Sequence, residues 1–322
     1  MRRLLVLTVG AAALVFPSVV AATAGGRPVA LVTAETSNEV LAVSLGPHGG
    51  RVLKRVHLDD PLMVAAPLHG PAVVVDPHGT VTLLGWHSLR PIKVFHGFRT
   101  PEVATIAPGD RYAYVADGGS GELVVIDLMR RKVVGHVYVG AGAHHLSFSP
   151  DGRRLWGALS EVATTVVRLD TSNPRKPRVV GRVHPPFAGH SVGFAPGGRT
   201  AWVSGASAHV VMVFSAATGR LVTELHAGRA PQEIAFARGQ ALITSGYGSS
   251  IESVSLRTLR PLRLVSAPYG SFNLDTYGAF VVTTSLLTGE VSEFRVGDLH
   301  RLWTTKVAPA ARYVAISVWP GR

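Results

Sequence analysis

The stretch HLSFSPDG at residues 145–152 decides the fold, because variants of it recur along the chain. Each variant is a short apolar segment that runs into a turn rich in Pro, Gly and Asp. Two other clear copies are VATIAPGD at residues 103–110 and SVGFAPGG at residues 191–198. One such unit cannot bury its own apolar faces, whereas stacked copies can, so the repeat defines the architecture.

The repeat has a regular period. The central apolar position of the short segment is separated from that of the next copy by 40 to 46 residues, and its members are Ile106, Phe148, Phe194, Phe236, Thr276 and Ile316. Three further short, β-branched segments follow each copy except the last, bounded by Gly, Pro, Asp or Asn turns, and no stretch shows a sustained helical period. This pattern predicts an all-β propeller whose blades are four-stranded and about forty residues long.

The two ends of the chain predict how the ring closes. Two weaker copies cover residues 29–58 and 61–95, and the first of them lacks its opening strand. Residues 312–317 form an opening strand with no second strand after it. We expect the C-terminal strand to complete the N-terminal blade, which removes an exposed sheet edge. The expected domain is a seven-bladed propeller over residues 25–322.

The N-terminus has the pattern of a secretory signal peptide. A cationic start is followed by an apolar run, Leu4–Phe16, and by the small-residue site Ala22-Thr23-Ala24. We predict a signal peptide over residues 1–24 and a secreted or extracytoplasmic location, in the periplasm or cell envelope. A retained membrane anchor is the alternative, although the apolar stretch is short for a span and contains Pro17.

Composition narrows the chemistry. The chain has no cysteine, which excludes disulfides, thiolate metal sites, covalent c-type haem and cysteine nucleophiles. The formal net charge is +12. Basic residues are spread along the chain, with local groups at 130–132 and 175–176. Such a charge favours binding to polyanions, namely nucleic acid, anionic cell-wall polymer or lipid headgroups, but solvated arginines of a generally basic proteome explain it more simply.

Three short motifs carry a resemblance to a known family. They are the Ser-Pro-Asp-Gly turn at 149–152, the degenerate turn Ala-Pro-Gly-Gly at 195–198, and Tyr-Val-Ala-Asp at 114–117, which departs at two positions from Tyr-Val-Thr-Asn. The chain resembles the seven-bladed propellers of the YVTN-repeat family, which includes periplasmic YncE-like proteins. The resemblance covers the mature chain and implies a fold and an extracytoplasmic setting. It implies no single activity, because such propellers include binders, lactonases and cofactor-bearing domains.

Two columns of the aligned repeats turn polar. Four positions before the central apolar residue stand Glu102, His144, His190, Gln232, Phe272 and Arg312, and three positions before it stand Val103, His145, Ser191, Glu233, Asn273 and Tyr313. The first strand of a propeller blade is the innermost, so these columns should surround one mouth of the central channel. The predicted ligand-binding residues are Glu102, His144, His145, His190, Gln232, Glu233, Asn273, Arg312 and Tyr313.

Several chemistries fit this mouth. His144 and His190 with Glu102 and Glu233 could hold a divalent metal, because neutral imidazole and carboxylate suit Zn, Mn or Fe. His144 or His190 could instead act with Glu233 and Arg312 on a lactone carbonyl. His145 could be an axial ligand of a planar cofactor, and alternation along a strand would turn it away from His144. A solvated mouth without a specific ligand is the remaining alternative.

The resulting functional hypotheses belong to different classes. The first is an exported monomeric binding or scaffold propeller that recognises a small ligand, metal or protein partner at the channel mouth. The second is a propeller-type lactonase, and the third is a polyanion binder. Histidines outside the mouth are expected to be solvated surface: His48, His57, His69, His78, His87 and His96. No Gly-rich phosphate loop opens a helix, which argues against Rossmann and P-loop chemistry.

Overall fold

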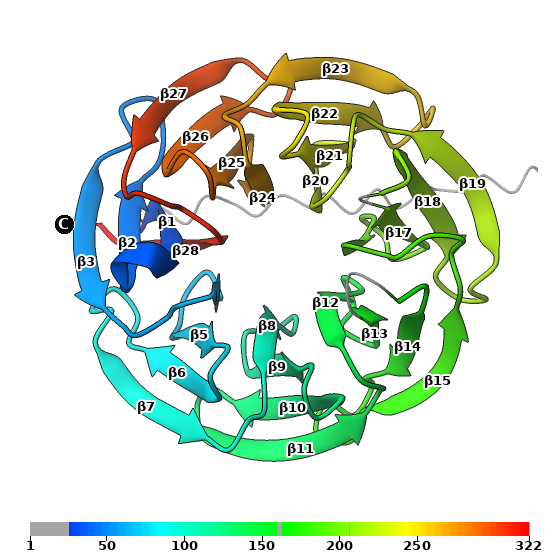
Figure 1. The fold of residues 1–322 in the computed structure, drawn as a ribbon, viewed down its shortest axis with the longest axis horizontal. Coiled ribbons are helices and arrows are strands. Elements are labelled where there is room, and N and C mark those ends of the chain that lie inside the picture. Colours follow the sequence, from blue (N-terminus) through cyan, green and yellow to red (C-terminus); the bar gives the residue numbers. More distant parts are fainter. Residues whose placement is uncertain (1–25, 160–162, 206, 322) are drawn as a thin grey trace, which may run out of the picture.

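Seven four-stranded antiparallel sheets surround a central axis in the computed structural model, which describes residues 26–159, 163–205 and 207–321 (Figure 1). The sheets are arranged as the blades of a propeller, so the predicted seven-bladed architecture is confirmed. The predicted signal peptide, residues 1–24, lies outside the described residues. No helix among the described residues is long and apolar enough to span a bilayer.

Each blade runs from an innermost strand at the axis to an outermost strand at the rim. The innermost strands are β28 (Val314–Pro320), β4 (Met63–Ala65), β8 (Pro101–Ile106), β12 (Ala143–Phe148), β16 (Val192–Phe194), β20 (Ile234–Ala237) and β24 (Ser271–Tyr277). The second strands are β1 (Gly26–Ala34), β5 (Ala72–Asp76), β9 (Tyr112–Asp117), β13 (Arg154–Leu159), β17 (Thr200–Gly205), β21 (Gln240–Ser245) and β25 (Phe280–Ser285).

The third and fourth strands complete each blade. The third strands are β2 (Glu39–Ser44), β6 (Thr80–Leu84), β10 (Glu122–Asp127), β14 (Val166–Asp170), β18 (Val210–Ser215), β22 (Ser250–Ser255) and β26 (Glu290–Arg295). The outermost are β3 (Val52–His57), β7 (Pro91–His96), β11 (Lys132–Tyr138), β15 (Arg178–Val183), β19 (Leu221–His226), β23 (Pro261–Ser266) and β27 (Arg301–Lys306). A short 3-10 helix, η1 (Glu35–Ser37), follows β1.

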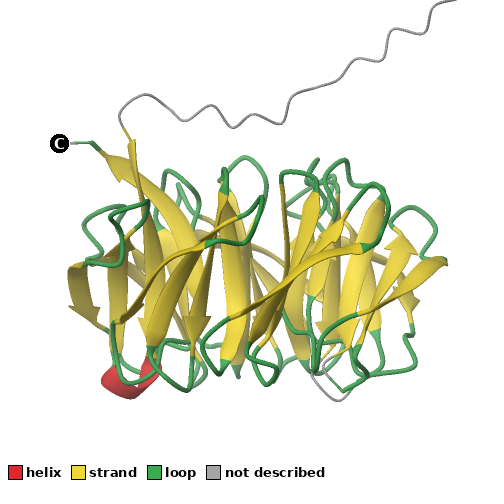
Figure 2. Cartoon of the chain, turned by 90° about the horizontal axis from the view of Figure 1, so that it is seen from above, coloured by secondary structure: helices red, strands yellow, loops and turns green. Residues whose placement is uncertain are grey.

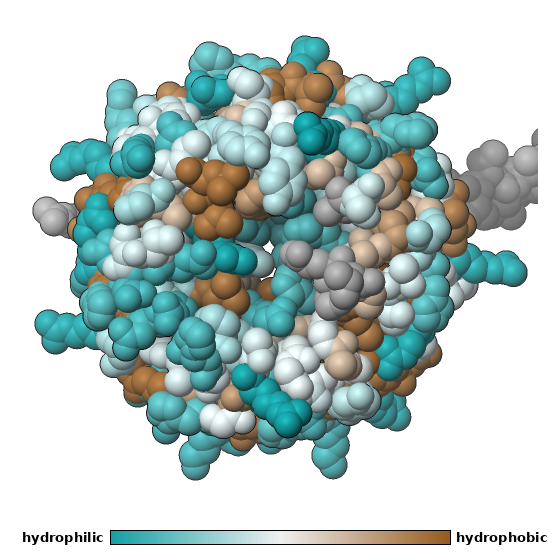
Figure 3. All heavy atoms as spheres, in the orientation of Figure 1, coloured by the Kyte–Doolittle hydropathy of each residue, from teal (hydrophilic) through white to brown (hydrophobic). Residues whose placement is uncertain are grey.

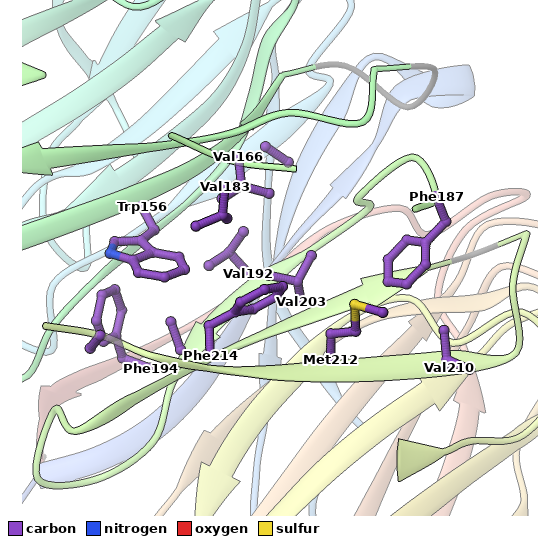
Figure 4. Packing of buried hydrophobic residues seen from close by; sticks show 13 residues of the cluster. Trp156, Val166, Val183, Phe187, Val192, Phe194, Val203, Val210, Met212 and Phe214 are labelled. Carbon is purple, nitrogen blue, oxygen red and sulfur yellow. The ribbon is translucent and has the colours of Figure 1, made fainter. Parts of the chain in front are cut away.

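The apolar core lies between neighbouring blades. In the cluster of Figure 4, Trp156 of β13 meets Phe194 of β16, with ring centroids 5.9 Å apart, and Phe214 of β18 completes the contact. Residues of the two middle strands are buried on both faces, since each sheet is covered by a blade on either side. This packing explains why middle strands such as β10 and β18 are apolar almost throughout rather than alternating.

The ring closes between the two ends of the chain, as predicted. β28 pairs antiparallel with β1, with Ala30 opposite Ile316. The neighbouring blade adds a second connection: the Glu293 carboxylate accepts the Gly46 N–H at 2.8 and 3.1 Å, and Trp303 Nε1 donates to the Gly46 carbonyl at 3.0 Å. Burial raises the pKa of Glu293, and the Gly46 hydrogen bond opposes that shift.

The two faces of the ring differ. η1 lies on the face where the innermost strands begin, and the C-terminal end of β28 leaves from the opposite face (Figure 2). The two polar columns of the sequence therefore gather on the η1 face.

Candidate functional site

Within the part of the chain that the structure describes, three connected hollows follow one another along the central channel. The outer hollow, about 310 Å³, lies at the mouth and is lined by His190, Gln232, Tyr247, Phe272, Asn273 and Arg312, among others. The inner hollow, also about 310 Å³, includes Met63, Val103, His145, Glu233, Asn273 and Asp275. Asn273 and Tyr313 line both. The far hollow, about 400 Å³, meets the inner one at Asp275 and opens at the Pro108 and Pro150 turns. Figure 3 shows the opening on the η1 face.

Hydroxyl groups of the second strands connect successive blades around the mouth. The hydroxyl donates to a backbone carbonyl at the start of the next inner strand, and we call this contact a hydroxyl bridge. The four bridges are Thr33 to Leu62 (3.1 Å), Ser204 to Gln232 (2.6 Å), Thr244 to Phe272 (2.7 Å) and Thr284 to Arg312 (2.6 Å). The bridges hold the backbone of the polar columns in register from blade to blade.

Three blade junctions have no hydroxyl at this position. Val75, Ala116 and Ala158 stand where the other second strands have Thr or Ser. The residues that follow these junctions are Glu102, His144 and His190. The acidic and imidazole side of the mouth therefore coincides with the junctions that lack bridges.

A β-bulge brings two histidines together. The register of β12 against β13 shifts between Ala143 and Leu146, so strict alternation fails at His144 and His145. Their ring centroids lie 4.3 Å apart, and the His145 centroid lies 4.7 Å from that of His190. The expectation that His144 and His145 would face opposite ways is therefore wrong. His144 Nε2 also lies 3.1 Å from the Glu102 carboxylate.

The buried His145 and the partly buried Glu233 form an imidazole–carboxylate pair. His145 Nδ1 lies 3.7 Å from Glu233 Oε2, and Ser191 Oγ donates to Glu233 Oε1 at 2.7 Å. Burial, together with the neighbouring His144, His190 and Arg312, lowers the pKa of His145 well below its usual value, so the ring is neutral. Burial raises the pKa of Glu233 to about 7, against the opposing effect of the Ser191 hydrogen bond.

Asp275 is a second channel carboxylate that was not among the predicted site residues. Its Oδ2 accepts the Ile316 N–H at 2.8 Å, and its Oδ1 accepts the Thr276 N–H at 2.7 Å. Burial raises the pKa of Asp275 to about 6, and these backbone donors oppose the shift. The signal in the sequence was its position: it is the one charged residue in a column of otherwise small residues, one place before the central apolar residue.

The outer hollow combines polar groups with an aromatic wall. Arg312 Nη1 donates to both carboxylate oxygens of Glu35 in η1, at 2.9 and 3.1 Å. Tyr247 packs edge-on to Phe272, with centroids 5.0 Å apart, and Tyr247 is half exposed. Asn273 Nδ2 donates to the Arg312 carbonyl at 3.0 Å. Glu35 lies in η1 and Tyr247 in a turn, both outside the aligned columns, so the repeat does not indicate either residue.

The predicted site residues gather on one face but divide into two groups. Arg312, His190 and Gln232 line the outer hollow, whereas Glu233 and His145 line the inner one. Among the residues that the structure describes, no three His, Asp or Glu side chains are placed to hold one metal ion. The metal ligand set therefore stays a prediction. The six histidines expected at the surface are all exposed.

Comparisons with known proteins address the fold. No protein-family model matches the chain, and no curated protein matches it significantly. The similarity found is one of fold. A functionally unknown protein from Desulfotomaculum acetoxidans has a TM-score of 0.78 at 14% identity, over 91% of this chain and 99% of that one.

Two enzyme structures are also similar. Hydrazine synthase from Kuenenia stuttgartiensis has a TM-score of 0.61 at 14% identity, covering 73% of this chain and 76% of that one. Dihydro-heme d1 dehydrogenase NirN, in complex with DHE, has a TM-score of 0.63 at 14% identity, over 87% of this chain and 64% of that one. At this identity, the similarity shows a shared propeller architecture alone.

Proposed function

We propose that this protein is a binding module that recognises a small organic ligand at the η1-face mouth of its central channel. One observation carries the proposal: polar and aromatic side chains from several blades converge on the outer hollow, which continues into the inner one. Each hollow has about 310 Å³, which is at the lower end of the range of about 300–1,000 Å³ for ligand pockets.

The chemistry of the outer hollow favours a ligand with a planar or apolar part and polar substituents. Tyr247 and Phe272 offer an aromatic surface on one wall. Arg312, Gln232 and His190 offer hydrogen-bonding groups near it. A small-molecule site usually combines an apolar or aromatic wall with a small number of polar groups.

Binding is better supported than lactone hydrolysis. Glu233 and Arg312, the two groups expected to act on one carbonyl, line different hollows. In the Ser191–Glu233–His145 series, the carboxylate contacts both other groups, at 2.7 Å from the hydroxyl and 3.7 Å from the imidazole. A nucleophilic triad instead requires the imidazole between the hydroxyl and the carboxylate.

The export of the chain and its relationship to YVTN-repeat propellers are part of the same proposal. The Tyr-Val-Ala-Asp segment at 114–117 and the Ser-Pro-Asp-Gly turn at 149–152 support the relationship, and the N-terminal pattern at 1–24 supports export. An extracytoplasmic binding module would meet its ligand outside the cytoplasm.

A fragment screen tests the proposed function. Ligand-observed NMR with a library of small aromatic and aliphatic polar compounds should give hits that bind the purified protein. Tyr247→Ala should weaken those hits at least tenfold, because it removes half of the aromatic wall. Tyr138→Ala is the matched control, since Tyr138 is an exposed tyrosine on the outermost strand β11. Absence of hits, or hits that are indifferent to Tyr247, would refute the proposal.

A further inference from the structure

The inner hollow contains acidic groups, and its lining, as far as the structure describes it, includes no lysine or arginine. Glu233 and Asp275 both line it, together with Asn273 and the neutral ring of His145. The rest of its wall is largely apolar, for example Val103 and Met63. An arriving ligand group would therefore meet hydrogen-bond acceptors between aliphatic side chains.

The two carboxyl groups are poorly stabilised as anions. Burial raises the pKa of Glu233 to about 7 and that of Asp275 to about 6, and the charge of Asp275 adds to the shift of Glu233. The hydrogen bonds that oppose these shifts come from a neutral hydroxyl and from backbone N–H groups. Both carboxyl groups are partly buried, and carboxylates removed from solvent are ordinarily paired with a cation, which stabilises the ionised form.

His145 provides an independent indication of a ligand. The residue is 5% exposed and lines the inner hollow, and its Nε2 has no hydrogen-bond partner among the described residues. A buried ring nitrogen without a partner is uncommon in native structures. Its Nδ1 lies toward Glu233, so a donor group that reaches this wall would meet the carboxylate and the imidazole together.

We propose that the inner hollow is a subsite for a protonated amine, carried by the same ligand whose planar or apolar part lies in the outer hollow. The proposal rests on the proposed function. An ammonium group has three N–H donors. It can therefore donate to acceptors that lie apart, such as Glu233 and Asp275, through a different N–H group for each. A metal ion requires ligands that converge, and the described residues include no converging group of three His, Asp or Glu.

The proposal implies that binding is linked to proton release. The amine enters already protonated and pairs with an ionised carboxylate. A carboxyl group that was protonated in the free protein loses its proton to solvent, and no covalent bond forms or breaks. Affinity for the amine should therefore rise with pH through the range of about 6 to 7, in which these carboxyl groups ionise.

The probe is 3-phenylpropylamine, with 3-phenylpropan-1-ol as its neutral counterpart. The phenyl group suits the Tyr247–Phe272 wall, and the three-carbon chain lets the amine pass Asn273 and Tyr313. By isothermal titration calorimetry at pH 8, the amine should bind at least tenfold more tightly than the alcohol. At pH 5.5 the amine should lose at least tenfold in affinity while the alcohol does not. Near pH 6.5, the heat of binding should vary with the ionisation enthalpy of the buffer.

Glu233→Gln is the decisive variant, because glutamine keeps the size of the side chain and an acceptor for Ser191. It should weaken the amine at least tenfold and leave the alcohol unchanged. Glu252→Gln is the matched control: Glu252 on β22 is another carboxylate with a raised pKa, it accepts the Gly228 N–H, and it does not line the channel. If Glu233→Gln fails to fold, Asp275→Asn makes the same comparison.

The outcomes separate this inference from the proposed function. Equal affinity for amine and alcohol, no binding of the amine, or an amine affinity indifferent to Glu233→Gln would each overturn the inference. Stoichiometric Zn²⁺ binding that depends on Glu233, without amine binding, would overturn it in favour of a metal site. If neutral fragments still bind in a Tyr247-dependent manner, the proposed function stands while the amine subsite falls.

Discussion

Glu233 shows how much a single side chain depends on its surroundings in this channel. It bonds to a serine hydroxyl and lies beside a neutral imidazole, and burial raises its pKa from 4.5 to about 7. A raised carboxyl pKa means that the folded chain binds a proton more tightly than the unfolded chain does. Ionising Glu233 therefore costs stability between about pH 4.5 and pH 7, and the full cost is present above pH 7.

This linkage predicts a pH-dependent effect of Glu233→Gln on stability. At pH 8 the variant should have a free energy of unfolding about 1–2 kcal/mol above that of the wild type, because it removes the buried charge. The gain should shrink as the pH falls and vanish below about 4.5, where the wild-type group is protonated in both states. Urea unfolding at pH 8 and pH 4 measures both values.

Glu224→Gln is the control for this experiment, because Glu224 is exposed on the outermost strand β19. It should leave the unfolding free energy unchanged at both pH values. A Glu233→Gln variant that is less stable than the wild type at pH 8 would contradict this prediction, because it would show that the ionised carboxylate stabilises the fold.

At the scale of single residues, the sequence identified the polar columns but not all of the site. Glu233, His145 and Arg312 were found because their columns turn polar at a fixed place in the repeat. Glu35 belongs to η1 and Tyr247 to a turn, and neither falls in an aligned column of the repeat. The contact of His144 with His145 could not be predicted, because a bulge changes the side-chain alternation without leaving a clear mark in the sequence.

At the scale of strands, the hydroxyl bridges fix the polar columns to one another. Thr244 on β21 accepts the N–H of Glu233 at 3.0 Å and donates to the carbonyl of Phe272 in the next blade at 2.7 Å. One hydroxyl thereby orients the backbone of a residue in each hollow. The sequence was sufficient to place Thr244 in the second strand. It was not sufficient to predict that the hydroxyl bonds the Phe272 carbonyl, because that contact depends on how neighbouring blades stack.

Thr244→Val tests the bridge with little change of shape. The variant should lose about 1–3 kcal/mol of unfolding free energy, because it leaves the Phe272 carbonyl and the Glu233 N–H without this partner. Chemical denaturation measures the loss. Thr223→Val serves as the control, since the Thr223 hydroxyl lies on the outermost strand β19 and bonds the adjacent carbonyl at 3.4 Å. Equal effects of the two variants would contradict a special role for the bridge.

At the scale of the whole molecule, the ring depends on a strand contributed from far along the chain. Val314, Ile316 and Trp319 of β28 are buried, and they pack against core clusters on both sides. The sequence was sufficient to predict the seven blades and this closure, because an opening strand was missing at one end and unmatched at the other. It was not sufficient to predict the Glu293–Gly46 contact, which joins strand β26 to the connection between β2 and β3 without a common motif.

Deletion of residues 314–322 tests the closure. The shortened chain should lose its single cooperative thermal transition and form aggregates, because β1 then presents an unpaired edge and an apolar surface. Circular dichroism melting and size-exclusion chromatography with light scattering measure both effects. Deletion of residues 321–322 alone, beyond β28, should unfold like the full chain. A 314–322 deletion that melts cooperatively near the wild-type temperature, as a monomer, would contradict the role of β28.

The pairing of β1 with β28 also has a kinetic consequence. The bond from the Tyr313 N–H to Thr33 joins residues 280 positions apart, whereas most strand contacts lie within one blade. Closing a loop of that length costs about 5 kcal/mol of chain entropy before its contacts form. Blades should therefore assemble early and the ring should close late, so the slowest refolding phase is expected to report on the junction of the two ends.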